Sequence, residues 1–155
     1  MMRRSDREIK ENPESVLDEC DCVRLGLIDE SGAYIVPMNF GKSTENGKTV
    51  LYMHSAKEGK KIGILKENNR VSFQADCRHE LKGGDIACEY GFLYKSVFGH
   101  GTVEFVKNAD EKIPVLSLIM QKYTGKEVWN FCEKHLESVE VIKLTVTDIT
   151  GKAHL

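Results

Sequence analysis

The fold is organised around residues 52–61, Tyr52-Met53-His54-Ser55-Ala56-Lys57-Glu58-Gly59-Lys60-Lys61. A strand is predicted to end at His54 and a helix to begin at Ser55, because Ser55 and Glu58 have the S-x-x-E spacing of a capping box. Lysines crowd the first turns of that helix, where each cation opposes the helix dipole by roughly 0.3–1 kcal/mol. An anion at the helix start would reverse this effect, because backbone N–H groups and lysines would bind it together. The stretch therefore favours a phosphate site, and a solvated lysine-rich helix face is the alternative.

The composition is typical of one globular domain covering residues 1–155, with 41% hydrophobic and 30% charged residues. A formal net charge of −2 gives no general attraction to nucleic acid, so no nucleic-acid partner is predicted. The basic residues are clustered locally, which favours a small anionic ligand. No leader and no run of ~20 apolar residues is visible, so a cytoplasmic protein without a membrane partner is predicted. The number of cysteines, five, is odd and the chain is predicted to be intracellular, so no disulfide framework is predicted.

Six strands are predicted from residue alternation and turn signals, over residues 22–28, 33–40, 49–54, 70–76, 87–106 and 139–149. Pro37 places the second strand at a sheet edge or at a bulge, because proline cannot donate to the ladder. Asn46-Gly47 is the strongest hairpin signal in the chain. Residues 77–84 are predicted to form a loop, and residues 151–155 a tail. Gly91, Gly99 and Gly101 indicate bends in a barrel-like strand.

Helices are predicted between these strands, at residues 13–20 with Asn12 as cap, 55–68, 110–123 with Asp110 as cap, and 127–136. Residues 1–10 form a charged N-terminal arm, and residues 110–136 form a helical insertion before the last strand. Because the first two strands join by a tight turn, the sheet is expected to be mainly antiparallel. The pattern predicts a mainly β domain, a β-barrel with α-helices, or an α+β domain.

Several familiar sites are not supported by the sequence. Neither a Walker loop nor a dinucleotide-binding glycine motif is present, since Gly99-His100-Gly101 lacks the spacing and the following helix. Cys77, His79 and Cys88 do not have the spacing of a recognised zinc motif, so no metal is predicted. A catalytic triad cannot be read from residue order, because such groups converge only in three dimensions.

Five segments occur together in a recognisable order. They are Met2-Arg3-Arg4-Ser5-Asp6-Arg7-Glu8-Ile9, Ile35-Val36-Pro37-Met38-Asn39-Phe40, His54-Ser55-Ala56-x-x-Gly59-x-Lys61, Tyr94-Lys95-Ser96-Val97-Phe98-Gly99-His100-Gly101 and Ile149-Thr150-Gly151-Lys152. With them the chain resembles the flavin-binding split-barrel proteins of the pyridoxamine 5'-phosphate oxidase-like group. More narrowly, it resembles the nitroimidazole-resistance branch, and the resemblance covers nearly the whole chain.

The resemblance implies a six-stranded antiparallel split β-barrel that forms a homodimer and binds FMN at each of two subunit interfaces. It implies that the strand Val36, Pro37, Met38, Asn39 lays its backbone along the isoalloxazine, and that Lys60 and Lys61 bind the phosphate. Met53, His54 and Ser55 would approach the flavin or its tail, and Gln74 and Ser96 are weaker assignments. Arg-Lys is common in the family where this chain has Lys60-Lys61, so the charge is kept and a bidentate fork is lost.

The implied function is that of an FMN-dependent oxidoreductase, which passes electrons from a reduced nicotinamide or another donor to a small acceptor such as a nitroaromatic compound. His54 is the candidate proton donor or substrate contact, and a structural histidine is the alternative. A non-catalytic module that binds flavin or haem for storage or sensing is the competing function, because a fold does not settle function. Oxidation of pyridoxamine phosphate is less favoured, since no basic C-terminal substrate motif is evident.

Overall fold

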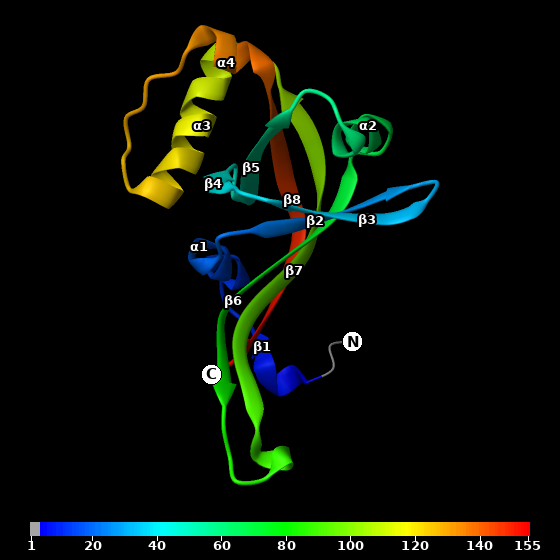
Figure 1. The fold of residues 1–155 in the computed structure, drawn as a ribbon, viewed down its shortest axis with the longest axis vertical. Coiled ribbons are helices and arrows are strands. Elements are labelled where there is room, and N and C mark those ends of the chain that lie inside the picture. The colour runs from blue at the N-terminus through cyan, green and yellow to red at the C-terminus, as the bar shows by residue number, and fades with distance from the viewer. Residues whose placement is uncertain (1–3) are drawn as a thin grey trace.

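The computed structural model describes residues 4–155 and consists of one long antiparallel sheet with helices at its flanks (Figure 1). Met2 and Arg3 of the first motif lie outside the described residues. The strand order is β3-β2-β6-β7-β8-β5-β4, with β1 paired to β8. The strands are β1 Glu8–Ile9, β2 Val23–Asp29, β3 Gly32–Met38, β4 Gly41–Glu45, β5 Lys48–Ala56, β6 Arg70–Lys82, β7 Gly91–Val106 and β8 Val139–His154. The sheet curves without closing, which confirms the predicted antiparallel split barrel.

Four α-helices and three 3-10 turns complete the fold. The helices are α1 Val16–Glu19, α2 Lys60–Glu67, α3 Ala109–Thr124 and α4 Glu133–Ser138. The 3-10 turns are η1 Ser5–Arg7, η2 Pro13–Ser15 and η3 Ala87–Glu89. Together α3 and α4 overlap the helical insertion predicted over residues 110–136, but α3 begins one residue before it and α4 ends two residues after it.

The prediction of six strands is wrong, because residues 4–155 form eight. The two additional strands carry little sequence signal: β1 has two residues, and β4 reads Gly-Lys-Ser-Thr-Glu without apolar alternation. The Asn46-Gly47 turn forms as predicted, with φ of 51° and 76°, and it pairs β4 to β5. The segment of β4 thus becomes a strand because the hairpin turn pairs it with β5, although its side chains show no strand pattern.

Two strands, β6 and β8, are longer than predicted by five residues or more. β6 continues to Lys82 through residues predicted as a loop, and a register shift between Cys77 and Glu80 accommodates Arg78 at φ 55°. The bulge absorbs the extra residues, so that β6 and β7 continue as a paired arm that projects from the barrel (Figure 1). β8 continues to His154 because β7 pairs with it from Val141 to His154, so most of the predicted tail is a strand.

The predicted helix starts are the least accurate part of the assignment. β5 runs through Ala56 and α2 begins at Lys60, so Ser55 lies in the sheet and the predicted capping box does not form. Asn108, rather than Asp110, caps α3 by accepting a 2.8 Å hydrogen bond from Asp110 N. Asn12 has φ 50° and makes no capping hydrogen bond with its side chain.

The helix predicted over residues 127–136 is also wrong, because residues 125–132 are irregular and α4 begins only at Glu133. Trp129 Nε1 donates a 2.8 Å hydrogen bond to Lys126 O within this segment. A local turn of this kind satisfies the indole N–H without a helix.

The core lies on both faces of the sheet. The main cluster packs side chains such as Leu25, Phe73 and Leu144 together with α1 and α2. A second cluster lies between β5, β8 and the helices α3 and α4. Pro37 lies on the edge strand β3, whose register with β2 is continuous, so the edge alternative holds and the bulge alternative does not.

Gly99 and Gly101 flank a register shift in the pairing of β7 with β8, which confirms their prediction as strand bends. A Cβ on Gly99 would lie closer than 3.0 Å to Asp148 O, and one on Gly101 closer than 3.0 Å to Thr145 O. Only a residue without a side chain lets the two strands approach this closely.

Candidate functional site

The start of α2 lacks a side-chain cap. Gly59 occupies the N-cap position at φ 128°, and the first backbone bond within the helix is Gly63 N to Gly59 O at 3.1 Å. The amides before Gly63 are therefore available to an external acceptor. A Cβ built on Gly59 or Gly63 would meet no atom within 4 Å, so the space beside this turn is open.

Lys60 connects this turn to the hairpin between β2 and β3. Its Nζ lies 3.5 Å from both Asp29 Oδ2 and Ser31 Oγ, and 4.9 Å from the centre of the Tyr34 ring. The hydrogen bonds from Ser31 lower the pKa of Asp29, with the charge of Lys60 as a further cause. Lys61 is half-buried and makes no side-chain hydrogen bond or ion pair within residues 4–155. The two predicted phosphate ligands thus differ, because Lys60 is already paired and Lys61 is not.

Ser55 precedes this turn and carries a buried hydroxyl without a partner. Within residues 4–155, Ser55 Oγ is the one buried side-chain oxygen or nitrogen that makes no hydrogen bond. Leaving such a group unsatisfied costs roughly 1–3 kcal/mol. The uncapped amides at the start of α2, together with Lys61, fit a phosphate group, and the unpartnered hydroxyl of Ser55 lies four residues before Gly59 in the chain.

A second group of predicted residues meets on the sheet. Pro37 of β3, Arg24 of β2 and Gln74 of β6 lie opposite one another in neighbouring strands. Arg24 Nη1 donates hydrogen bonds to Gln74 Oε1 at 3.2 Å and to Asp76 Oδ1 at 2.8 Å. Ser96 lies opposite Asp76 in the next strand. Sequence reasoning missed Arg24, and an arginine inside a predicted strand of mostly apolar residues was the signal that could have found it.

The remaining predicted site residues do not lie beside Pro37, Gln74 and Ser96 in the sheet. His54 is exposed on β5, opposite Val141 of β8, and makes no side-chain hydrogen bond within residues 4–155. β7 and β8 separate β5 from β6 in the strand order, so His54 and Gln74 are not neighbours in the sheet. The side chains of Met38 and Met53 are buried in the core, which leaves their backbone groups for a ligand. Asn39 Nδ2 donates a 3.3 Å hydrogen bond to Asp21 O, and Val36 is half-buried.

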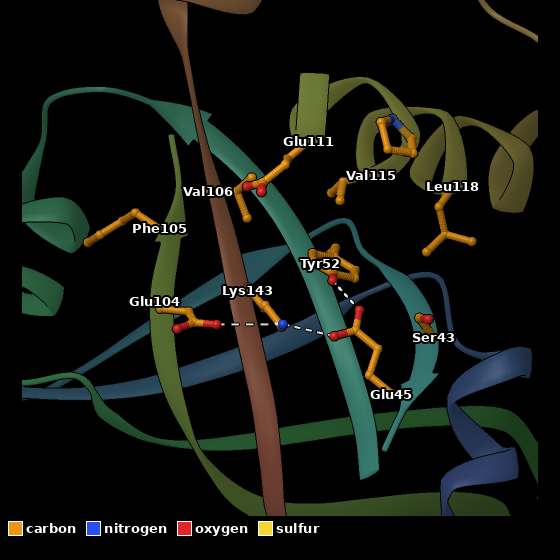
Figure 2. A pocket seen from close by; sticks show the side chains of 11 residues that line it. Ser43, Glu45, Tyr52, Glu104, Phe105, Val106, Glu111, Val115, Leu118 and Lys143 are labelled. Atoms are coloured by element: carbon orange, nitrogen blue, oxygen red, sulfur yellow. Dashed lines mark hydrogen bonds and ion pairs between the residues drawn. The ribbon is translucent and has the colours of Figure 1, made fainter. Parts of the chain in front are cut away.

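A pocket of about 670 Å³ lies between α3 and the sheet (Figure 2), and none of the predicted site residues lines it. Its floor is a chain of ionic contacts. The Tyr52 hydroxyl donates a hydrogen bond to Glu45 Oε1, and Lys143 Nζ lies 2.8 Å from Glu45 Oε2 and 3.5 Å from Glu104 Oε1. Hydrogen bonds from Lys143 and then Tyr52 lower the pKa of Glu45, and the Glu45 hydrogen bond raises the pKa of Lys143. Burial, followed by the Glu45 hydrogen bond, raises the pKa of Tyr52.

This chain of contacts predicts a pH-dependent contribution to stability. Because the folded pKa of Glu45 is lowered from 4.5, its stabilising effect is present above pH 4.5 and is lost as the pH falls through the lowered value. Glu45→Gln should therefore lower the urea midpoint at pH 7, and the difference from the parent protein should shrink toward pH 3. Glu133→Gln, at an exposed position outside the pocket, is the control. A difference that stays constant from pH 7 to pH 3 would contradict this prediction.

Two further classes of site have no support within the described part of the chain. Among residues 4–155, no group of three or more His, Cys, Asp or Glu side chains is arranged to hold a metal ion. Across the same residues, no helix combines the length and apolarity needed to cross a bilayer. The five cysteines are all free thiols.

Comparison with known proteins identifies relatives of this fold. The family model described as pyridoxamine 5'-phosphate oxidase matches residues 10–153. A solved structure of a candidate 5-nitroimidazole antibiotic resistance protein from Bacteroides thetaiotaomicron superimposes with a TM-score of 0.81. The two chains are 34% identical, over 94% of this chain and 86% of that chain. No curated protein shows a significant match to the sequence.

More distant solved structures share the fold alone. A flavocytochrome from Azotobacter vinelandii has a TM-score of 0.79 at 18% identity, over 99% of this chain and 72% of that chain. An FAD and haem binding protein from Mycobacterium smegmatis has a TM-score of 0.77 at 18% identity, over 93% of this chain and 70% of that chain. The split barrel of this chain therefore recurs in proteins that differ widely in sequence.

Proposed function

This chain belongs to the pyridoxamine 5'-phosphate oxidase family, and from that premise we propose that it is a cytoplasmic FMN-dependent oxidoreductase. The start of α2 carries the proposal. There, uncapped amides, two lysines and the unpartnered hydroxyl of Ser55 lie along one short stretch of chain. Together these groups suit a phosphate monoester, such as the one that ends the FMN side chain.

The proposed FMN site divides the predicted residues between two parts of the cofactor. Lys60, Lys61 and Ser55 would hold the phosphate. The ring would lie along the backbone from Val36 to Asn39, which includes Pro37 at the edge of the sheet, because within residues 4–155 β3 pairs with β2 alone. Arg24 would hold Gln74 in place through its 3.2 Å hydrogen bond. When bound, FMN supplies the redox chemistry, and the protein supplies orientation and charge.

The proposed electron acceptor is a small nitroaromatic compound, and the proposed donor is a reduced nicotinamide. The relative that is 34% identical is a candidate 5-nitroimidazole antibiotic resistance protein, which supports an acceptor of this class. His54 is the proposed proton donor, because its exposed imidazole makes no hydrogen bond within residues 4–155 that would occupy it.

A homodimer is part of the proposal. The sheet face that carries Arg24 and Gln74 also exposes Ile28, Ile35, Phe92 and Phe98, which share that face by their register. Exposed apolar side chains gathered on one uncovered face are typical of an interaction surface. A second copy on this face would bury them beside the edge strand β3.

The absorbance spectrum of the purified protein, recorded before and after adding FMN, tests the proposal. Flavin bands that stay with the protein through gel filtration, and that bleach on addition of NADH or NADPH and return with a nitroimidazole, are the expected result. Sedimentation of the same sample should show a dimer at micromolar concentration. Colourless protein that gains no flavin band would overturn the proposal, and a Soret band would favour haem binding instead.

Ser55→Ala should separate the cofactor role of this hydroxyl from a structural role. Removing a buried, unsatisfied hydroxyl should leave the unfolding free energy of the flavin-free protein unchanged or slightly raised. The same change should weaken FMN binding severalfold, because one hydrogen bond to a phosphate is lost. Chemical denaturation and flavin fluorescence titration measure the two effects. Ser117→Ala, which removes a half-buried hydroxyl from α3, is the matched control.

A further inference from the structure

A second pocket opens on the uncovered sheet face, apart from the start of α2. It has a volume of about 500 Å³ and is lined by residues of β2, β6, β7 and β8, among them Gly26, Ile28, Arg70, Ser72, His100 and Asp148. None of these residues belongs to the predicted FMN contacts. The pocket is nevertheless on the same face as Gln74, because Ser72 and Gln74 point the same way along β6.

His100 is held in this pocket by three neighbours. Its Nδ1 lies 2.9 Å from Asp148 Oδ1, and its backbone oxygen accepts a 3.1 Å hydrogen bond from Thr147 Oγ1. The ring of Phe98 meets the imidazole edge-on, with the ring centres 5.0 Å apart. A carboxylate on Nδ1 orients the ring and leaves Nε2 as the free nitrogen.

The backbone around His100 is shaped to hold this arrangement. The register of β7 against β8 shifts between His100 and Gly101. Gly99 and Gly101 allow β8 to approach more closely than any side chain would permit. A bulge of this kind commonly aims a side chain at a functional site. The orientation of His100 is therefore set by strand pairing as well as by Asp148.

Arg70 gives the pocket an unpaired positive charge. Asp148 is paired with His100, whereas the guanidinium of Arg70 makes no side-chain hydrogen bond or ion pair within residues 4–155. A guanidinium binds a carboxylate through two parallel hydrogen bonds. Beside it, Ile28 is exposed and offers an apolar surface to a ring.

We propose that this pocket binds a small aromatic carboxylate, with the carboxylate on Arg70, His100 Nε2 hydrogen-bonded to the ligand, and the ring against Ile28. That this aromatic carboxylate is the electron acceptor rests on the proposed function. Because the pocket opens on the face assigned to the dimer, a ligand bound here would lie at the subunit interface. Arg70 and His100 then determine which acceptor binds. The residues that contact FMN do not by themselves account for that choice.

Titration calorimetry with 4-nitrobenzoate tests the pocket directly, using nitrobenzene as the uncharged probe. We expect saturable binding of 4-nitrobenzoate that weakens about tenfold in Arg70→Gln, because one charge-assisted contact is lost. Binding of nitrobenzene should be the same in both proteins. Arg4→Gln, an exposed arginine outside the pocket, should bind both probes as the parent does. Equal affinity of the parent and Arg70→Gln for 4-nitrobenzoate would overturn the proposal, as would absence of saturable binding.

His100 is tested by the imidazole signals in NMR spectra of the same titration. The His100 Nε2 resonance should shift on addition of 4-nitrobenzoate, and the His135 signals should not. Asp148→Asn should reduce the affinity severalfold while leaving the Arg70 contact in place, because the ring loses the group that orients it. Unchanged His100 signals at saturation would overturn its role. Since these measurements need no flavin, protein that binds 4-nitrobenzoate but gains no flavin band on addition of FMN would keep the pocket and overturn the proposed function.

Discussion

Replacing Lys60 and Lys61 together by alanine should weaken FMN binding by more than tenfold. A charge-assisted hydrogen bond is worth about 1.5–3 kcal/mol, and each 1.4 kcal/mol changes affinity tenfold. Lys61 should contribute more of this loss, because it is half-buried and makes no other side-chain contact within residues 4–155. Lys60 must leave Asp29 and Ser31 to reach a phosphate, and that exchange reduces its net contribution.

Flavin fluorescence titration of the parent and the single and double variants measures this effect. Riboflavin, which has no phosphate, separates loss of the phosphate site from general damage, since its affinity should not change in the double variant. Lys66→Ala changes an exposed lysine in the last turn of α2 and should bind FMN as the parent does. The same FMN affinity in the double variant and the parent would remove the phosphate site from the start of α2.

Gly101→Val should lower the unfolding free energy by about 3 kcal/mol, at the upper end of the usual cost of overpacking. A Cβ at this position would lie closer than 3.0 Å to Thr145 O, which is backbone and cannot rotate away. Relief of the clash requires β7 and β8 to separate beside the bulge, and these strands form the longest pairing in the sheet. The melting temperature should fall by roughly 6–12 °C for a chain of this size.

Gly63→Ala is the matched control for this prediction. A Cβ at Gly63 would meet no atom within 4 Å, and the residue lies inside α2. Alanine there should raise stability by roughly 0.5–1 kcal/mol, because glycine is unfavourable inside a helix. Scanning calorimetry of both variants compares the two positions. Similar melting temperatures for Gly101→Val and the parent would show that the strands separate at little cost.

The strands with regular alternation were predictable because their side chains carry the pattern. In β6, buried Val71, Phe73 and Ala75 alternate with more exposed neighbours, and the predicted strand begins at the observed residue. β4 has no such pattern and forms because the Asn46-Gly47 turn brings it to β5. Its side chains alone would not distinguish it from a loop. Pairing with a neighbour also decided the length of β8, whose last residues are polar.

The candidate site was predictable as a list of residues and less so as an arrangement. The lysines at the start of α2 stand out in the sequence because cations oppose the helix dipole there. Which of them is free depends on the hairpin between β2 and β3, which contacts Lys60. Arg24 and the His100–Asp148 pair could be identified only from the strand register, because the two residues in each contact are about 50 residues apart in the chain.

The sequence by itself determined the family resemblance, the antiparallel β architecture and the cluster of lysines after residue 56, and it limited Pro37 to a sheet edge or a bulge. Only the tertiary structure decided what Ser55 does. Its S-x-x-E spacing allows a capping box, but β5 pairs with β8 through Ala56, and the ladder opposite Glu140 and Val139 holds Ser55 in the sheet. Pairing in that ladder prevents Ser55 from forming the local capping hydrogen bond. Ser55 is left as a buried hydroxyl without a partner, and Gly59 becomes the uncapped start of α2.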